Sequence, residues 1–231
     1  TTLSSVFSIL IALISLPPRA CAQTDKNGSA VYNQSGTAVI KGTKRIPTEY
    51  YNNRANELGG AVFNGGTMTL SYINFGANSD YIHGSYSNRA ENGGAFANTG
   101  TATISNVNMV ENTADELGGA IYNTGTLKLT SSTLDSNITY YGGGIYNAAT
   151  DAKKTLTISK STLINNIAYQ DGGAIYTTYN FADTNSTITG NNAKNGGGLY
   201  VADSNDSGTT VTLNKTKLYN NYAEYDGGAI N

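Results

Sequence analysis

The stretch Gly118-Gly119-Ala120-Ile121-Tyr122-Asn123 is one of eight copies of a phrase that decides the fold of this chain. Each copy begins with a glycine, continues through small residues, and usually ends in an apolar residue and an aromatic one. The copies begin at Gly28, Gly59, Gly93, Gly118, Gly142, Gly172, Gly196 and Gly227, at intervals of 24 to 34 residues. A period of this length is typical of a solenoid, in which one supersecondary unit stacks on copies of itself.

Two further short runs recur between the glycine phrases. The first, as in Thr126-Leu127-Lys128-Leu129-Thr130, alternates with period two and predicts a half-buried strand. The second ends in asparagine, as in Leu134-Asp135-Ser136-Asn137. Three short strands per repeat and no helical period predict an all-β chain, folded as a right-handed parallel β-helix of about eight coils.

Strand alternation assigns two adjacent positions of the phrase to opposite faces. The first is predicted to point into the core: Val31, Val62, Phe96, Ile121, Ile145, Ile175, Leu199 and Ile230. The second is predicted to point outward: Tyr32, Phe63, Ala97, Tyr122, Tyr146, Tyr176, Tyr200 and Asn231. Because coils stack in register, the outward rings should stack as well, at roughly 0.5–1.5 kcal/mol per pair.

Glycine and asparagine are expected to form the turns. The glycine pairs supply positive φ angles without steric cost. The asparagines of the Asn-x-Ala steps are expected to tolerate left-handed geometry and to form a hydrogen-bonded amide ladder: Asn53, Asn88, Asn112, Asn166, Asn191 and Asn221. Longer intervals place extra residues in loops at 79–86, 147–153 and 202–208.

The N-terminus predicts export. Residues Val6 to Leu16 form an apolar run, too short to span a bilayer, and Ala20-Cys21-Ala22 offers a cleavage site before Gln23. We therefore expect a signal peptide at 1–22 and a repeat domain at 23–231 that is truncated at its C-terminus. Lipidation of Cys21 is the less favoured alternative. After cleavage the chain has no cysteine, so disulfides cannot stabilise it.

The composition argues against several functions. Only 13% of residues are charged and the formal net charge is −2, so the chain lacks the excess of basic residues that is typical of proteins that bind nucleic acids. No phosphate-binding loop, zinc-ligand spacing or nucleophile motif occurs. We therefore expect no catalytic residue, no metal site and no cofactor.

Parallel β-helices also include polysaccharide lyases, so an enzyme stays the alternative. Acidic residues precede several glycine phrases, and in one row they would form a weak divalent-ion ladder: Glu57, Glu91, Glu116, Asp171 and Asp226. A solvent-facing turn is the preferred interpretation, because uncharged residues share the position. We interpret His83 as a solvated loop residue. Arg54 and Arg89 occupy matching positions, which we attribute to the common origin of the repeats.

The combination of Gly-Gly-Ala-Ile-Tyr-Asn with a Phe/Leu-x-x-Asn run resembles the repeat of the chlamydial polymorphic outer-membrane proteins and of similar adhesin-like β-helix proteins. The resemblance covers about residues 27–231, although Phe75 is the only phenylalanine at its position. It implies a surface-exposed passenger, which in that family a C-terminal outer-membrane β-barrel often carries. An anchor of that kind would follow residue 231.

These observations favour a non-enzymatic, exported protein of the cell surface or the extracellular space. We expect an adhesin-like passenger that binds a host-cell surface protein or glycan, with no nucleic-acid partner and no transmembrane segment after cleavage. The alternatives are a pectate-lyase-like β-helix enzyme and a purely structural spacer. The candidate binding strip is the outward row of Tyr122, Tyr146, Tyr176 and Tyr200.

Overall fold

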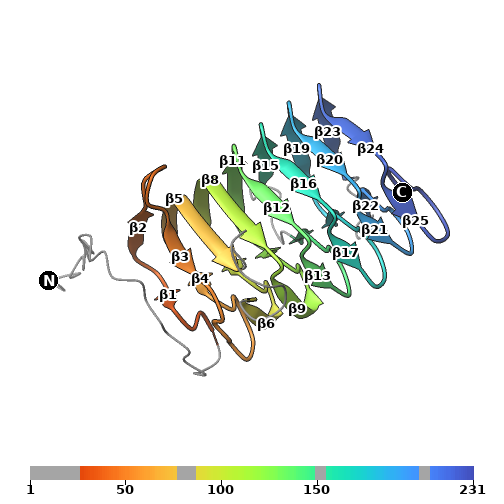
Figure 1. The fold of residues 1–231 in the computed structure, drawn as a ribbon. Coiled ribbons are helices and arrows are strands. Elements are labelled where there is room, and N and C mark those ends of the chain that lie inside the picture. The colour runs from red at the N-terminus through yellow and green to blue at the C-terminus, as the bar shows by residue number, and fades with distance from the viewer. Residues whose placement is uncertain (1–26, 77–86, 149–154, 203–208) are drawn as a thin grey trace, which may run out of the picture.

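The computed structural model describes residues 27–76, 87–148, 155–202 and 209–231, and every regular element in these ranges is a β-strand. Parallel strands stack along one axis into a β-helix of about six turns (Figure 1). The predicted fold class is thus confirmed. The eight phrases slightly overcount the turns, since the third sheet has a strand in only six of them. The signal segment, His83, the 79–86 loop and most of the other two loops lie outside the described residues.

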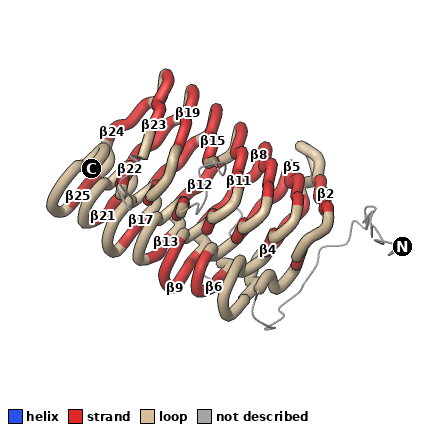
Figure 2. Tube along the Cα trace, turned by 180° about the vertical axis from the view of Figure 1, so that it is seen from behind, coloured by secondary structure: helices blue, strands red, loops and turns tan. Residues whose placement is uncertain are grey.

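Three parallel sheets form the walls of the β-helix, and short loops join them around each turn (Figure 2). The first sheet holds the glycine phrases: β1 (Val31–Asn33), β4 (Val62–Asn64), β7 (Phe96–Asn98), β10 (Ile121–Asn123), β14 (Ile145–Asn147), β18 (Ile175–Thr177) and β22 (Leu199–Val201). The third sheet has six short strands: β6 (Arg89–Asn92), β9 (Thr113–Leu117), β13 (Ile138–Thr139), β17 (Ile167–Ala168), β21 (Asn192–Ala193) and β25 (Tyr222–Ala223).

The second sheet contains both of the predicted runs of each repeat. Its strands are β2 (Thr37–Lys41), β3 (Thr48–Tyr50), β5 (Thr67–Gly76), β8 (Thr101–Val110), β11 (Thr126–Thr130), β12 (Thr133–Asp135), β15 (Leu156–Ser159), β16 (Thr162–Ile164), β19 (Phe181–Thr184), β20 (Thr187–Thr189), β23 (Val211–Asn214) and β24 (Lys217–Tyr219). A single left-handed residue separates the two runs, for example Ser131 with φ 50°. The strands β5 and β8 continue through this position.

The structure therefore has up to four strand segments per turn where the sequence predicts three. The additional segment is the short strand of the third sheet, such as β13, which follows the ladder asparagine. Two residues are too few to show a period-two pattern, which explains why periodicity does not reveal it.

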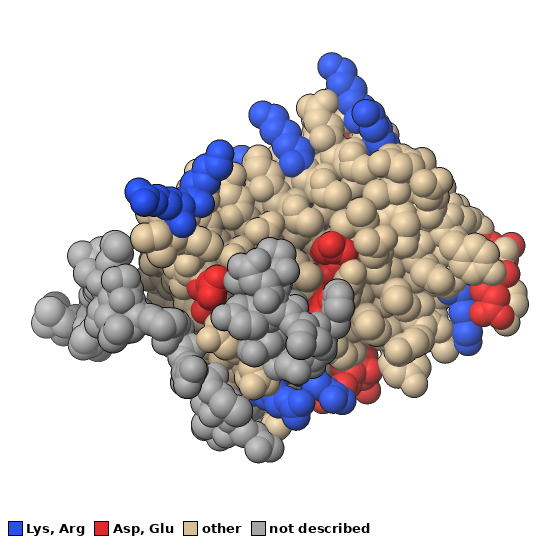
Figure 3. All heavy atoms as spheres, in the orientation of Figure 1, with Lys and Arg blue, Asp and Glu red and all other residues tan. Residues whose placement is uncertain are grey.

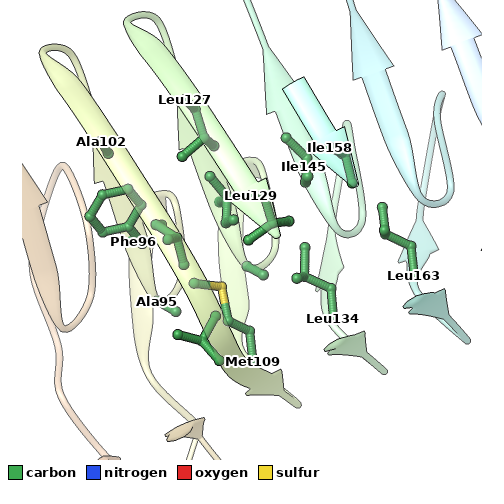
Figure 4. Packing of buried hydrophobic residues seen from close by; sticks show 14 of the residues in the cluster. Ala95, Phe96, Ala102, Met109, Leu127, Leu129, Leu134, Ile145, Ile158 and Leu163 are labelled. Carbon is green, nitrogen blue, oxygen red and sulfur yellow. The ribbon is translucent and has the colours of Figure 1, made fainter. Parts of the chain in front are cut away.

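The core is one continuous apolar column. The predicted inward residues from Val62 to Leu199 are fully buried, and only the end positions Val31 and Ile230 are partly exposed. Residues of the second sheet complete the column from the opposite wall, where Leu127, Leu129 and Met109 pack (Figure 4). Stacking thus buries side chains that a single coil would leave in water.

The glycine pair performs two separate tasks. The first glycine of every phrase has a positive φ, as predicted; Gly118 has φ 66°. The second lies against the next coil. A Cβ on Gly119 would lie 2.2 Å from the backbone oxygen of Gly143, so the close approach of two coils excludes a side chain there.

The predicted asparagine ladder is present, with Nδ2 of each member donating to Oδ1 of the next at 2.8–3.0 Å. It runs through Asn53, Asn88, Asn112, Asn137, Asn166, Asn191 and Asn221. The prediction that these asparagines themselves take the left-handed geometry is wrong, however. The residue before the asparagine adopts it, for example Ser136 (φ 55°) and Asn165 (φ 55°). The ladder side chain is thereby turned inward, where it is buried.

A second amide ladder closes the turn after the glycine phrase. It joins Asn33, Asn64, Asn98, Asn123 and Asn147 and ends at Thr177, with distances of 2.7–2.9 Å. The sequence signal for this ladder is the asparagine that ends most of the glycine phrases. The two polar ladders thus lie on either side of the second sheet, where they satisfy buried polar groups of the turns.

Candidate binding surface

The outward tyrosine row of the first sheet is formed as predicted. Parallel register aligns Tyr122 with Tyr146, then with Tyr176 and Tyr200. Their ring centroids are 5.8, 4.9 and 5.2 Å apart, and the interplanar angles of 10°, 7° and 15° make all three pairs stacked. These four side chains are half-buried.

The row does not continue as an exposed surface toward the N-terminus. Tyr32 stacks on Phe63 at 5.1 Å, but Phe63 is only 7% exposed and Ala97 is fully buried. Both residues occupy the outward positions of the row, but they are buried. Ala97 has no ring, and its methyl group lies between strands that carry Phe63 and Tyr122.

Stacking limits what the row presents to a ligand. Each inner ring has neighbouring rings on both faces, so its free parts are the ring edge and the hydroxyl group. Burial raises the pKa of Tyr122 and of Tyr146. Burial, together with its tyrosine neighbours and Asp171, raises the pKa of Tyr176 to about 12. These phenols are therefore protonated near neutral pH and can donate hydrogen bonds.

A second group of tyrosines extends the aromatic surface around the glycine turn. Tyr141 meets Tyr176 edge-on, with centroids 5.7 Å apart and an angle of 74°. Next to it, Tyr140 and Tyr169 form another edge-on pair at 5.6 Å and 68°. The sequence carries a signal for this group, since aromatic residues stand shortly before two glycine phrases.

Other residues singled out in the sequence have partners on neighbouring coils. Arg54 and Arg89 are bridge partners, as their matching positions predict. The guanidinium of Arg89, however, donates from Nε and Nη2 to Asp115 Oδ1, at 3.0 and 2.6 Å. Asp171 Oδ1 accepts a hydrogen bond of 2.8 Å from Asn195 Nδ2.

The acidic residues before the glycine phrases do not share one row. Asp171 aligns with Asn195, and that row continues through Tyr141 and Leu117 to Asn92. The positions immediately before these last two, Glu116 and Glu91, therefore lie in a neighbouring row. The proposed single-row alignment is wrong, and within the described ranges no three His, Cys, Asp or Glu residues are grouped to hold a metal ion.

Lys and Arg side chains lie at the margins of the face shown in Figure 3, Asp and Glu side chains lie both at the margins and near its centre, and much of the remaining described surface is uncharged. Fold and surface together define a parallel β-helix repeat protein. The family model of the Chlamydia polymorphic membrane protein repeat matches residues 106–124 and 160–178. Each match contains an asparagine-ended run and the glycine phrase after it, so the chain carries repeats of this kind.

The comparisons with curated proteins and with solved structures give no significant match. Within the described ranges, no helical segment has the length and apolar character that a membrane crossing requires. The repeat and the fold fit a surface β-helix protein.

Proposed function

We propose that this chain is an adhesin-like passenger, exported through a signal peptide at 1–22 and displayed at the cell surface, where it binds a host-cell protein or glycan. The observation that supports this most is the row of outward tyrosines on a rigid column. Large rings with a polar tip are enriched where proteins meet partners, because they provide contact area at a low cost in side-chain entropy. The column holds these rings in fixed positions.

Bead adhesion tests the proposal. Beads coated with residues 23–231 should adhere to cultured host cells more than beads coated with an unrelated β-helix. If the stacked row binds, replacing Tyr146 and Tyr176 with serine lowers adhesion at a temperature where the variant is still folded. Tyr32→Ser, on the far side of Ala97, is the matched control. Full adhesion by the folded double variant would reduce the row to a scaffold, and no adhesion of the wild type would favour a structural spacer.

Export has its own test. Intact-mass measurement of protein recovered from the extracellular or outer-membrane fraction should give a mature N-terminus at Gln23. Recovery of uncleaved protein from the cytosol alone would contradict export.

We also propose that the chain has no catalytic activity. Incubation with pectin and related polymers, with and without calcium, should release no product. Calcium-dependent release of unsaturated sugars would replace the adhesin proposal with a β-helix lyase.

A further inference from the structure

The two tyrosine groups differ in the part of the ring that they expose. In the stacked row, neighbouring rings cover the faces of Tyr146 and Tyr176. Tyr140 and Tyr169 meet edge to face instead, and their exposed fractions are 50% and 56%. An edge-on contact covers at most one face of one ring, so this pair leaves ring faces open to solvent.

Apolar side chains extend the surface beside this pair. Ile138 and Ile167 are register partners on β13 and β17, next to the tyrosines along the chain, and Ile167 is 36% exposed. Backbone hydrogen bonds hold the two coils together here: Tyr169 N donates to Thr139 O at 2.9 Å, and Gln170 N donates to Tyr140 O at 2.9 Å. The positions of the rings are thus set by the stacked coils.

The surrounding charges do not favour an anionic ligand. Asp115, which precedes the pair by one coil, is neutralised by Arg89 at 2.6 Å. Glu116 is exposed beside Tyr141, whose backbone N donates to Glu116 O at 3.1 Å. Lys194 lies on the coil after Tyr169, and Glu224 occupies the matching position one coil further on. The positions in register with the pair thus hold one acid, Asp115, and one base, Lys194, so the site has no excess of positive charge to attract a sulfate or carboxylate.

We propose that Tyr140 and Tyr169 form the site at which this protein binds an uncharged glycan, with a pyranose ring stacked on an open tyrosine face. The negative face of an aromatic ring attracts the slightly positive C–H bonds of a sugar. The second ring, inclined at 68°, then contacts the edge of the sugar. Asn192, the exposed register partner of Ile167, lies alongside and offers an amide to sugar hydroxyls.

This inference rests on the proposed adhesin function and names the ligand class. Its test is affinity electrophoresis of residues 23–231 in gels that contain a neutral polysaccharide (mannan, galactomannan, dextran or hydroxyethylcellulose) or an anionic one (polygalacturonate or heparin). We expect retardation in at least one neutral gel. The Tyr140→Ala/Tyr169→Ala variant should bind at least about tenfold more weakly than the wild type, which is the loss expected when ring anchors at the centre of an interface are removed.

Two controls separate ring stacking from folding. Tyr219→Ala removes a ring of equal exposure (50%) on β24 and should leave retardation unchanged. Tyr140→Phe/Tyr169→Phe keeps both ring faces and should retain most of the binding, which keeps the test valid if the alanine variant does not fold. Retardation only in anionic gels, no retardation in any neutral gel, or unchanged retardation of a folded alanine variant would overturn the inference.

The outcomes also distinguish the inference from the function on which it rests. If beads adhere to cells but the alanine variant adheres as well as the wild type, the adhesin proposal stands and the glycan site is refuted. If the protein is retarded through these two rings but no cell type binds it, the adhesin proposal fails.

Discussion

Replacing Asn137 with alanine tests whether the buried amide ladder stabilises the β-helix. The Asn137 amide makes four hydrogen bonds. Its Nδ2 donates to Met109 O at 3.0 Å and to Asn166 Oδ1 at 2.9 Å. Its Oδ1 accepts from the backbone N of Asn112 at 2.9 Å and from Asn112 Nδ2 at 3.0 Å. Both Asn112 and Asn137 are fully buried.

The expected loss follows from the groups left without partners. Alanine at position 137 leaves two donors of Asn112 unpaired, its backbone N–H and one N–H of its amide. An unsatisfied buried polar group costs about 1–3 kcal/mol, so the free energy of unfolding should fall by about 2–6 kcal/mol. At the end of the same ladder, Asn221 is half-exposed, and water can replace it. Asn221→Ala should therefore lower the free energy of unfolding by about 1 kcal/mol or less.

Urea unfolding followed by circular dichroism measures both variants. Because stacked repeats can unfold in parts, amide hydrogen exchange at coils on either side of residue 137 should accompany it. The largest increase in exchange is expected at the two coils joined by Asn137. Equal losses for Asn137→Ala and Asn221→Ala, or a loss below about 1 kcal/mol at position 137, would refute the claim that the ladder acts by satisfying buried groups.

Three further changes probe other parts of the structure. Gly119→Ala should lower the free energy of unfolding by about 1–3 kcal/mol or prevent folding, because its Cβ would lie 2.2 Å from Gly143 O. Thermal melting checks this, and Gly144→Ala is the control because other phrases have alanine at that position. Asp183→Ala should lower the free energy of unfolding, measured in urea, by about 2–5 kcal/mol. The buried side chain of Asp183 accepts hydrogen bonds from the hydroxyl groups of Ser186 and Thr216, at 2.5 and 2.7 Å, and its removal would also leave a cavity. The pKa of Tyr176 is raised from 10.0 to about 12, so the folded protein keeps a proton that the unfolded chain releases, and stability should fall as pH rises through this interval. Tyr176→Phe should make the melting temperature less dependent on pH there, and an identical pH profile would contradict this assignment.

Much of the fold could be predicted because the repeat states each structural role several times. The inward column, the outward rings, the positive φ of the first glycine and one amide ladder all follow from position within the phrase. A single coil would have been ambiguous, since short apolar runs fit helix and strand alike. Eight copies in register remove that ambiguity, because only stacking explains why the same position is apolar each time.

The remaining features depend on contacts between coils, which the pattern within one coil does not contain. The left-handed residue before Asn137 follows from the direction in which the ladder amide must point, and sequence alone shows only a polar neighbour. Asp183 interrupts the inward column between Ile158 and Leu213. Its hydroxyl partner Thr216 comes from the following coil, 33 residues later. No local pattern links these two residues.

The candidate site illustrates a general consequence of stacking. A uniform row of tyrosines is easy to recognise in the sequence, yet its uniformity makes each ring cover the next. Tyr140 and Tyr169 stand at a position that neighbouring coils fill with Asp115 and Lys194, so the row of rings is only two members long. This pair meets edge-on at 68°, and both side chains are at least half-exposed. In a regular solenoid, open ring faces are therefore expected where the repeat is broken, whereas the repetitive stacked positions present ring edges and hydroxyl groups.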